Sequence, residues 1–280
     1  MSTITFHPAG HNVRPGVSRR WRQELNTVVT VAARDITGTL KNPGTLALSL
    51  LMPLLMMGLI GGNLMQNMTG GLGFDFGEFM LVGMLVNMLF MVTTMSMASL
   101  VDDTDNNYSL ELLVAPVSRY AIVIGKIAGS AFQAIVSCLG VLLVGALMGI
   151  TLSVWQLLAL LALSPLMCLA GGALAMIVMG SVKNNRAANM VVMMITMPQM
   201  FLSGVIIPIN HSSGILFVLS RVMPMTYCVD LGRAVIYAGS PQYSSVVLFN
   251  PAISLIAIAA LTVFFLVVGT YLYARSEKNR

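Results

Sequence analysis

Long stretches without charge alternate with short polar segments along the chain. Each apolar stretch reaches the roughly 20 residues that a helix needs to cross the hydrocarbon core of a bilayer. The pattern predicts an all-α integral membrane protein with six transmembrane helices. The six predicted spans are residues 45–64, 79–101, 121–150, 154–182, 187–208 and 246–274.

The composition supports this class. Hydrophobic residues make up 57% of the 280 residues and charged residues only 9%, whereas soluble domains are about 25% charged. One soluble core could not bury so much apolar surface. The chain is therefore expected in a lipid bilayer.

The basic residues predict the orientation. With six spans, both termini lie on one side, and that side carries 13 of the 15 lysines and arginines. Only Arg221 and Arg233 fall on the other face. Because short cytoplasmic loops are rich in Lys and Arg, both termini are predicted to be cytoplasmic. The net charge of +5 therefore reflects the predicted topology. The sequence has no basic patch with stacking aromatic residues of the kind that binds nucleic acid.

The polar N-terminal tail, residues 1–43, precedes a predicted transmembrane domain at 44–276. Within the tail, apolar residues recur every three or four positions, which is typical of an amphipathic helix lying in the cytoplasmic interface. These residues are Trp21, Leu25, Val28, Val29, Ala32, Ile36 and Leu40. A soluble helix packed on another protein fits the same pattern.

A second unusual segment lies before the last span. Residues 214–239 are apolar but interrupted by charge and by Pro224, so they are too broken to cross the membrane. We expect two short helices around Pro224 that dip into the outer leaflet as a re-entrant hairpin, with Tyr227 on it and with Asp230 and Arg233 able to pair at i,i+3. A plain external loop is the alternative.

The chemistry that the sequence lacks narrows the function. The predicted spans contain no Asp, Glu, His or Arg, and their only charged residue, Lys126, lies near enough to the cytoplasmic end to snorkel. This argues against ion-coupled transport. No phosphate-binding loop or catalytic constellation is visible, and the three cysteines are scattered, so neither an enzyme nor a metal site is expected. Energy for directed transport would come from another polypeptide.

A polar segment at 101–126 separates the second and third spans. Residues 109–114 can form a short helix with Leu110, Leu113 and Val114 on one side, and Pro116 ends it. Such a helix between two spans suits mechanical coupling, because a push on it moves both spans. A solvated connecting loop is the alternative.

Two motif regions resemble a known family. The run Glu111-Leu112-Leu113-Val114-Ala115-Pro116-Val117-Ser118-Arg119, followed by Gly125-Lys126, resembles the corresponding loop of type 2 permeases of ATP-binding cassette exporters. The run 201–208, FLSGVIIP, followed by Pro224, Tyr227, Asp230 and Arg233, resembles that family's fifth-span exit and outer hairpin. The resemblance covers essentially the whole chain and has the general character of drug-resistance and polyketide-antibiotic exporters.

The resemblance implies a half-transporter in the plasma membrane of a bacterium or archaeon. It would pair with a second permease, identical or paralogous, and with two ATPase subunits that hold the ATP and magnesium, so this chain would need no cofactor of its own. Residues 109–115 would be the coupling helix that docks on the ATPase. Its contact set would be Leu110, Glu111, Leu113, Pro116, Ser118 and Arg119.

Methionine stripes on the second and fifth predicted spans suggest a substrate pathway, because methionine adapts to apolar ligands of varied shape. Asn87 and Gln199 could supply polar handles. The pathway set is Met84, Asn87, Met88, Met91, Met193, Met197, Gln199 and Met200. Ordinary packing between helices explains the same residues.

Together these features predict an exporter of a hydrophobic or amphipathic small molecule, or of a lipid-linked one, driven by a partner's ATP hydrolysis. Efflux of antibiotics is one expected form of this activity. An energy-independent facilitator or channel, or a membrane scaffold without an ATPase partner, is the alternative.

Overall fold

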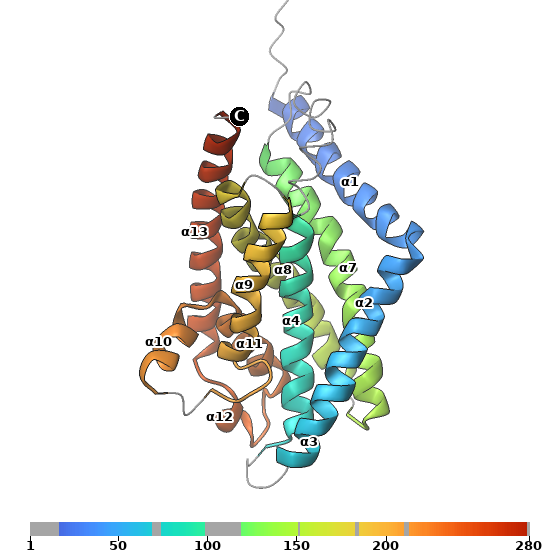
Figure 1. Ribbon diagram of the computed structural model, residues 1–280, viewed down its shortest axis with the longest axis vertical. Coiled ribbons are helices and arrows are strands. Elements are labelled where there is room, and N and C mark those ends of the chain that lie inside the picture. The colour runs from blue at the N-terminus through green and yellow to red at the C-terminus, as the bar shows by residue number, and fades with distance from the viewer. Residues whose placement is uncertain are drawn as a thin grey trace, which may run out of the picture.

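The computed structural model describes residues 17–68, 74–98, 119–150, 152–182, 185–209 and 213–278. In these ranges the regular elements are all helices, and the long ones run side by side as one bundle (Figure 1). The all-α prediction is confirmed for this part of the chain. The elements are α1 (Val17–Lys41), α2 (Pro43–Leu55), η1 (Met56–Gly61), α3 (Gly62–Met68), α4 (Phe76–Ala98), α7 (Arg119–Leu147), α8 (Val154–Ser181), α9 (Asn185–Leu202), α10 (Gly214–Val222), α11 (Pro224–Ile236), α12 (Tyr243–Val246) and α13 (Pro251–Lys278).

Five of the predicted spans correspond to stretches that are long and apolar enough to cross a membrane. Each predicted boundary lies within a few residues of the observed one. These stretches are Pro43–Leu64, Phe76–Met97, Ala121–Leu147, Val154–Ser181 and Tyr243–Leu272. The chain is therefore a multi-pass membrane protein by helix length and composition.

The predicted fifth span is shorter than its apolar run. Residues 187–208 were predicted as one helix, but α9 ends at Leu202 and is not among the five long apolar stretches. Gly204 has a φ of +77°, a left-handed conformation that ends helices. The following Val205-Ile206-Ile207 continues the apolar pattern without continuing the helix. In Figure 1, α9 nevertheless lies alongside α4 and α8.

The last long helix also differs from the prediction, because α13 begins at Pro251 and the predicted span began at 246. Proline is favoured in the first turn, where its missing N–H costs no hydrogen bond. The preceding Asn250 accepts a hydrogen bond from the Ala252 N–H at 3.0 Å, which caps the helix. Residues 247–250 therefore form a separate connection.

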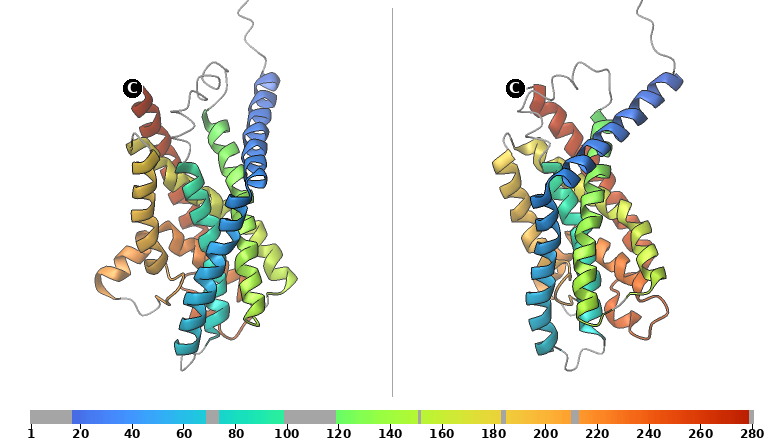
Figure 2. Two further views of the ribbon diagram at one scale, coloured as in Figure 1. Left: turned by 45° about the vertical axis from the view of Figure 1, so that its right-hand side comes forward. Right: turned by 90° about the vertical axis from the view of Figure 1, so that its right-hand side faces the viewer.

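A sharp turn at Asn42 separates α1 from α2 (Figure 2). The Asn42 side chain accepts a hydrogen bond from the Thr45 N–H at 3.2 Å, and Pro43 is the first residue of α2. Both residues favour a helix start. The structure thus confirms a helix over most of the predicted tail and a turn before the first span.

The centre of the bundle is α4. Its apolar stretch is 72% buried, whereas Pro43–Leu64 is 17% buried and Tyr243–Leu272 is 22% buried. The first and last spans therefore lie on the outside. Figure 1 places the start of α1 and the end of α13 at one end of the bundle, while α3 and α12 lie toward the other.

Candidate functional site

At the end of the bundle where α1 begins and α13 ends, α1 and α7 make a close contact. Gly129 of α7 lies against α1 so closely that a Cβ atom on it would be 2.6 Å from the Asp35 Cβ. At Gly125 a Cβ would be 2.9 Å from the Val28 carbonyl oxygen. Small residues spaced four apart allow such an approach between helices. The helix that packs against these two glycines is α1.

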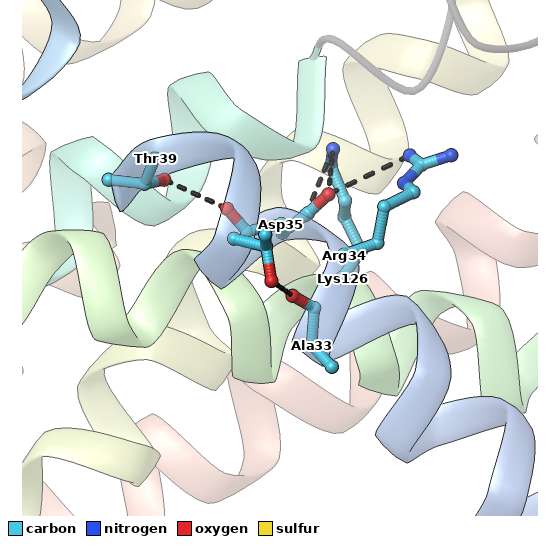
Figure 3. Close-up of polar contacts among 6 residues, drawn as sticks. Ala33, Arg34, Asp35, Thr39 and Lys126 are labelled. Carbon is cyan, nitrogen blue, oxygen red and sulfur yellow. Dashed lines mark hydrogen bonds and ion pairs between the residues drawn. The ribbon is translucent and has the colours of Figure 1, made fainter. Parts of the chain in front are cut away.

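An ion pair joins the same two helices (Figure 3). The Lys126 Nζ lies 3.0 Å from Asp35 Oδ2, and it donates a hydrogen bond to Oδ1 at 3.3 Å. Only 7% of the lysine side chain and 13% of the aspartate side chain are exposed. On the other side, Arg34 Nη2 lies 3.6 Å from Asp35 Oδ1.

This geometry corrects the prediction that Lys126 snorkels to the cytoplasm. The lysine is buried against α1 because a carboxylate from that helix lies beside it, and a shielded ammonium group is stable only with such a partner. Sequence reasoning missed the pair because Asp35 was assigned to the exposed polar face of an interfacial helix. The signal that could have found it is the alignment of Asp35 with Val28 and Ala32 on one helix face.

A polar cavity of about 330 Å³ adjoins the pair. Its lining comes from α1, α2, α4 and α7, so it lies where α1 meets the spans. It is lined by Arg34, Asp35, Gly38, Thr39, Thr45, Ser96, Lys126, Gly129, Ser130 and Gln133. Thr39 Oγ1 donates a hydrogen bond to the Asp35 carbonyl oxygen at 3.0 Å, so this hydroxyl is hydrogen-bonded within α1. Water can reach this junction.

The predicted coupling residues lie outside the part of the chain whose side chains the structure describes. They are Leu110, Glu111, Leu113, Pro116, Ser118 and Arg119. Arg119 is the first residue of α7. The coupling helix therefore stays a prediction.

The predicted pathway residues differ in how far they are buried. On α4, Met84 and Asn87 are buried and Met88 and Met91 are half-buried; on α9, Gln199 is buried, Met200 is half-buried, and Met193 and Met197 are exposed. The structure brings one pair together, since Asn87 Nδ2 lies 3.8 Å from the Met200 sulfur.

Polar atoms at the interface of α4 and α9 lack protein partners. Asn87 Oδ1, both amide atoms of Gln199 and Ser203 Oγ are buried without a hydrogen bond in the described part of the chain. Each such atom costs about 1–3 kcal/mol relative to a paired one. This interior is therefore less stable than an apolar interior of the same shape.

The predicted pair of short helices around Pro224 is present. The helices α10 and α11 meet at an angle of 80° with Pro224 at the start of α11. Tyr227 donates from its hydroxyl to the Arg221 carbonyl oxygen at 2.7 Å, and its ring stacks on Phe249 at 5.4 Å between centroids. These contacts fix the bend and tie it to the segment before α13.

Asp230 and Arg233 do not pair with each other as the i,i+3 spacing suggested. Asp230 accepts hydrogen bonds from the Leu248 N–H at 2.6 Å, the Phe249 N–H at 3.2 Å and the Ser254 hydroxyl at 2.8 Å. No ion pair between Asp230 and Arg233 occurs among the described residues. Both oxygens of the carboxylate instead hold the start of α13 to α11.

Arg233 is buried and holds the end of α9. Its Nη2 donates to the Gly204 carbonyl oxygen at 2.6 Å, and its guanidinium lies over the Phe79 ring at 3.5 Å from the centroid. A cation near the carbonyl end of a helix is favourable, and the aromatic face adds to the attraction. The hairpin is thereby joined to α4 and α9 at once.

Within the described ranges, no group of three or more His, Cys, Asp and Glu side chains is placed to hold a metal ion. Cys138, Cys168 and Cys228 are free thiols. The arrangement therefore offers helix contacts that can transmit movement, together with an interior that contains unpaired polar atoms.

Comparison with known families gives one match. Residues 26–237 match the model of a family described as ABC-2 type transporter. The matched range begins in α1 and ends directly after α11, so it includes the ion pair, the α4–α9 interior and the outer hairpin. No curated protein matches the chain.

Proposed function

Because the chain belongs to the ABC-2 type transporter family, we propose that it is the permease subunit of an exporter for a hydrophobic or amphipathic small molecule, or a lipid-linked one. The ATP is hydrolysed by a separate ATPase subunit, as the family implies. The cargo leaves the cytoplasm or the inner leaflet. A drug or antibiotic is one cargo of this chemistry.

The observation that carries the proposal is the shielded Asp35–Lys126 ion pair. The helix α7 begins at Arg119, directly after the segment that contains the predicted coupling helix. The ion pair and the two glycine contacts join the first part of α7 to α1. Further along, a Cβ at Gly140 would be 2.8 Å from the Leu50 carbonyl oxygen, so α2 also packs closely on α7.

These contacts suggest how movement of the ATPase subunits is transmitted to the spans. A displacement of the segment at 101–118 moves the start of α7, and α1 and α2 follow because they are packed on it. The end of α4, which precedes the same segment, moves too. In this proposal, closure of the two ATPase subunits reorients the spans between inward-facing and outward-facing states.

The pathway in this proposal lies beside α4 and α9. The half-buried Met88, Met91 and Met200 give an adaptable apolar surface. Asn87 Oδ1 and both amide atoms of Gln199, which lack a hydrogen-bond partner among the described residues, are available to water or to polar groups of a cargo when the helices separate. A second permease copy would complete the pathway, and the outer hairpin would close its external end.

The test uses the permease together with its ATPase partner in liposomes. Replacing Glu111 and Arg119 with alanine should lower transport-coupled ATPase activity while the protein still inserts into membranes. The matched control replaces Arg275 and Glu277, which lie near the end of α13, with alanine. It should leave coupling unchanged.

Two results would overturn the proposal. Undiminished coupling in the Glu111→Ala/Arg119→Ala variant would remove the coupling assignment. Transport by the permease alone, at the same rate with and without the ATPase and ATP, would favour the facilitator.

A further inference from the structure

A second cavity lies away from the α4–α9 interior, between α7 and α8. Its floor is formed by Leu85 and Leu89 of α4, which are almost fully buried. Its rim contains Leu139 of α7 and Leu161 of α8, with 56% and 51% of their surface exposed. The cavity is therefore a groove that opens sideways from the bundle.

The groove has no polar group to offer. The two lining residues that carry polar atoms are Cys138 and Ser164. The Ser164 hydroxyl donates to the Leu161 carbonyl oxygen at 2.7 Å, and the Cys138 thiol donates to the Leu85 carbonyl oxygen at 3.5 Å. Leucine and isoleucine provide the rest of the lining. An occupant gains nothing from a hydrogen-bonding group and loses the hydration of any polar group that it inserts.

The depth of the groove matches one leaflet. Its lining on α8 runs from Leu157 to Ser164, and α8 begins at Val154. At 1.5 Å per residue, Ser164 lies about 15 Å from the start of the helix, which is half the thickness of a typical hydrocarbon core. The groove thus extends from near one membrane surface to near the bilayer centre.

The size of the groove limits the occupant. Its volume is about 200 Å³. Pockets for drug-sized ligands have volumes of about 300–1,000 Å³, so the groove is smaller than such a pocket. A single hydrocarbon chain is narrow and flexible enough to follow the floor.

We propose that this groove binds one acyl chain of a phospholipid from the leaflet on the hairpin side. The chain lies along α4 between α7 and α8, and its headgroup stays at the membrane surface, outside the groove. The site is separate from the proposed cargo pathway, because its walls are α7 and α8 and its opening faces the bilayer. Binding depends on the chain and not on the headgroup.

The test counts lipids bound to the full-length chain by native mass spectrometry in mild detergent. The probes are phosphatidylethanolamine, phosphatidylglycerol and phosphatidylcholine with identical acyl chains. The variant Leu139→Ala/Leu161→Ala removes the rim. The control Leu143→Ala/Leu158→Ala changes two leucines of the same helices, with 55% and 50% of their surface exposed, that do not line the groove.

The wild-type chain should bind a first lipid saturably, with similar affinity for the three headgroups. Loss of the rim contacts should weaken that binding on the order of fivefold, because dispersion contacts with two leucine side chains disappear. The control should bind as the wild type does. A further variant, Ser164→Leu, adds a larger side chain to the lining of the groove and should also weaken lipid binding. Ser181→Leu on the same helix lies outside the groove and should not.

Three results would overturn the proposal. The first is the absence of a saturable first lipid on the wild-type chain. The second is an equal loss in the rim variant and its control, which indicates a general annular layer. The third is a strong preference for one headgroup, which places the binding energy outside the groove.

Discussion

Lys126 of α7 and Asp35 of α1 form an ion pair 91 positions apart in the sequence, with both side chains largely shielded from solvent. The pair lies beside two glycines that bring the helices together. It connects α7, which follows the predicted coupling segment, to α1. The contribution of this ion pair to the free energy of unfolding can be measured on the purified protein, separately from its role in transport.

Lys126→Met should lower the free energy of unfolding by roughly 2 kcal/mol, because it leaves the shielded Asp35 carboxylate with the more distant Arg34, at 3.6 Å, as its neighbouring cation. The double variant Asp35→Asn/Lys126→Met should lose much less than the sum of the two single variants. Thermal unfolding of the purified protein gives the three values of this double-mutant cycle. Additive losses would show that the two side chains do not interact.

The close contact at Gly129 gives a second prediction. Gly129→Ala should destabilise the protein by about 1–3 kcal/mol, because the added Cβ would lie 2.6 Å from the Asp35 Cβ and the helices must separate. The control is Gly38→Ala on α1, where a Cβ would meet nothing within 4 Å. That change should stabilise the helix by roughly 0.5–1 kcal/mol, since alanine is the better helix former. Unfolding midpoints of the two variants should therefore shift in opposite directions.

The buried arginine of the hairpin gives a third prediction. Arg233→Met should cost roughly 2 kcal/mol, because the Gly204 carbonyl loses a charged hydrogen-bond donor and the methionine cannot replace it. Limited proteolysis and the unfolding midpoint should both report a loosened hairpin. Arg221→Met is the control, since Arg221 is half-exposed and lies over the Phe217 ring. Equal effects of the two changes would contradict a special role for Arg233.

The connection before α13 gives a fourth prediction. Asp230→Asn replaces one of the two acceptor oxygens with a donor, so a backbone N–H at Leu248 or Phe249 loses its partner, at a cost of about 1–3 kcal/mol. Asp75→Asn is the matched control. Asp75 accepts a hydrogen bond from the Glu78 N–H at the exposed start of α4, and asparagine caps a helix equally well. Only the first change should lower the unfolding midpoint.

The apolar spans could be predicted from the sequence because lipid imposes a uniform requirement on every residue of a span. The end of α9 could not be predicted in this way. Val205 and Ile206 are as apolar as the helix before them, and the chain leaves the helix because Gly204 adopts a positive φ and Arg233 binds its carbonyl oxygen. A turn whose residues are buried has the same apolar pattern as a helix, so hydropathy does not reveal it.

The polar contacts were also beyond local reasoning. The spacing of Asp230 and Arg233 suggested a pair on one helix, yet Asp230 bonds to groups 18 to 24 positions away and Arg233 to a carbonyl 29 positions away. Lys126 was predicted to snorkel because it lies near the cytoplasmic end of its span, but its partner Asp35 lies 91 positions away on a different helix. Where a side chain is buried, tertiary neighbours override the preference for nearby residues.

The side-chain amides of Asn87 and Gln199, which contain buried atoms without a hydrogen-bond partner among the described residues, give the last prediction. Asn87→Leu/Gln199→Met replaces both with apolar groups of similar size, so the free energy of unfolding should rise by about 1–3 kcal/mol as buried polar atoms disappear. If these amides meet water or cargo during export, ATP-driven transport in liposomes should fall although the protein is more stable. The control Met194→Leu changes an exposed residue of α9 outside the predicted pathway set and should alter neither property strongly. A more stable variant that transports at the wild-type rate would remove both amides from the proposed pathway.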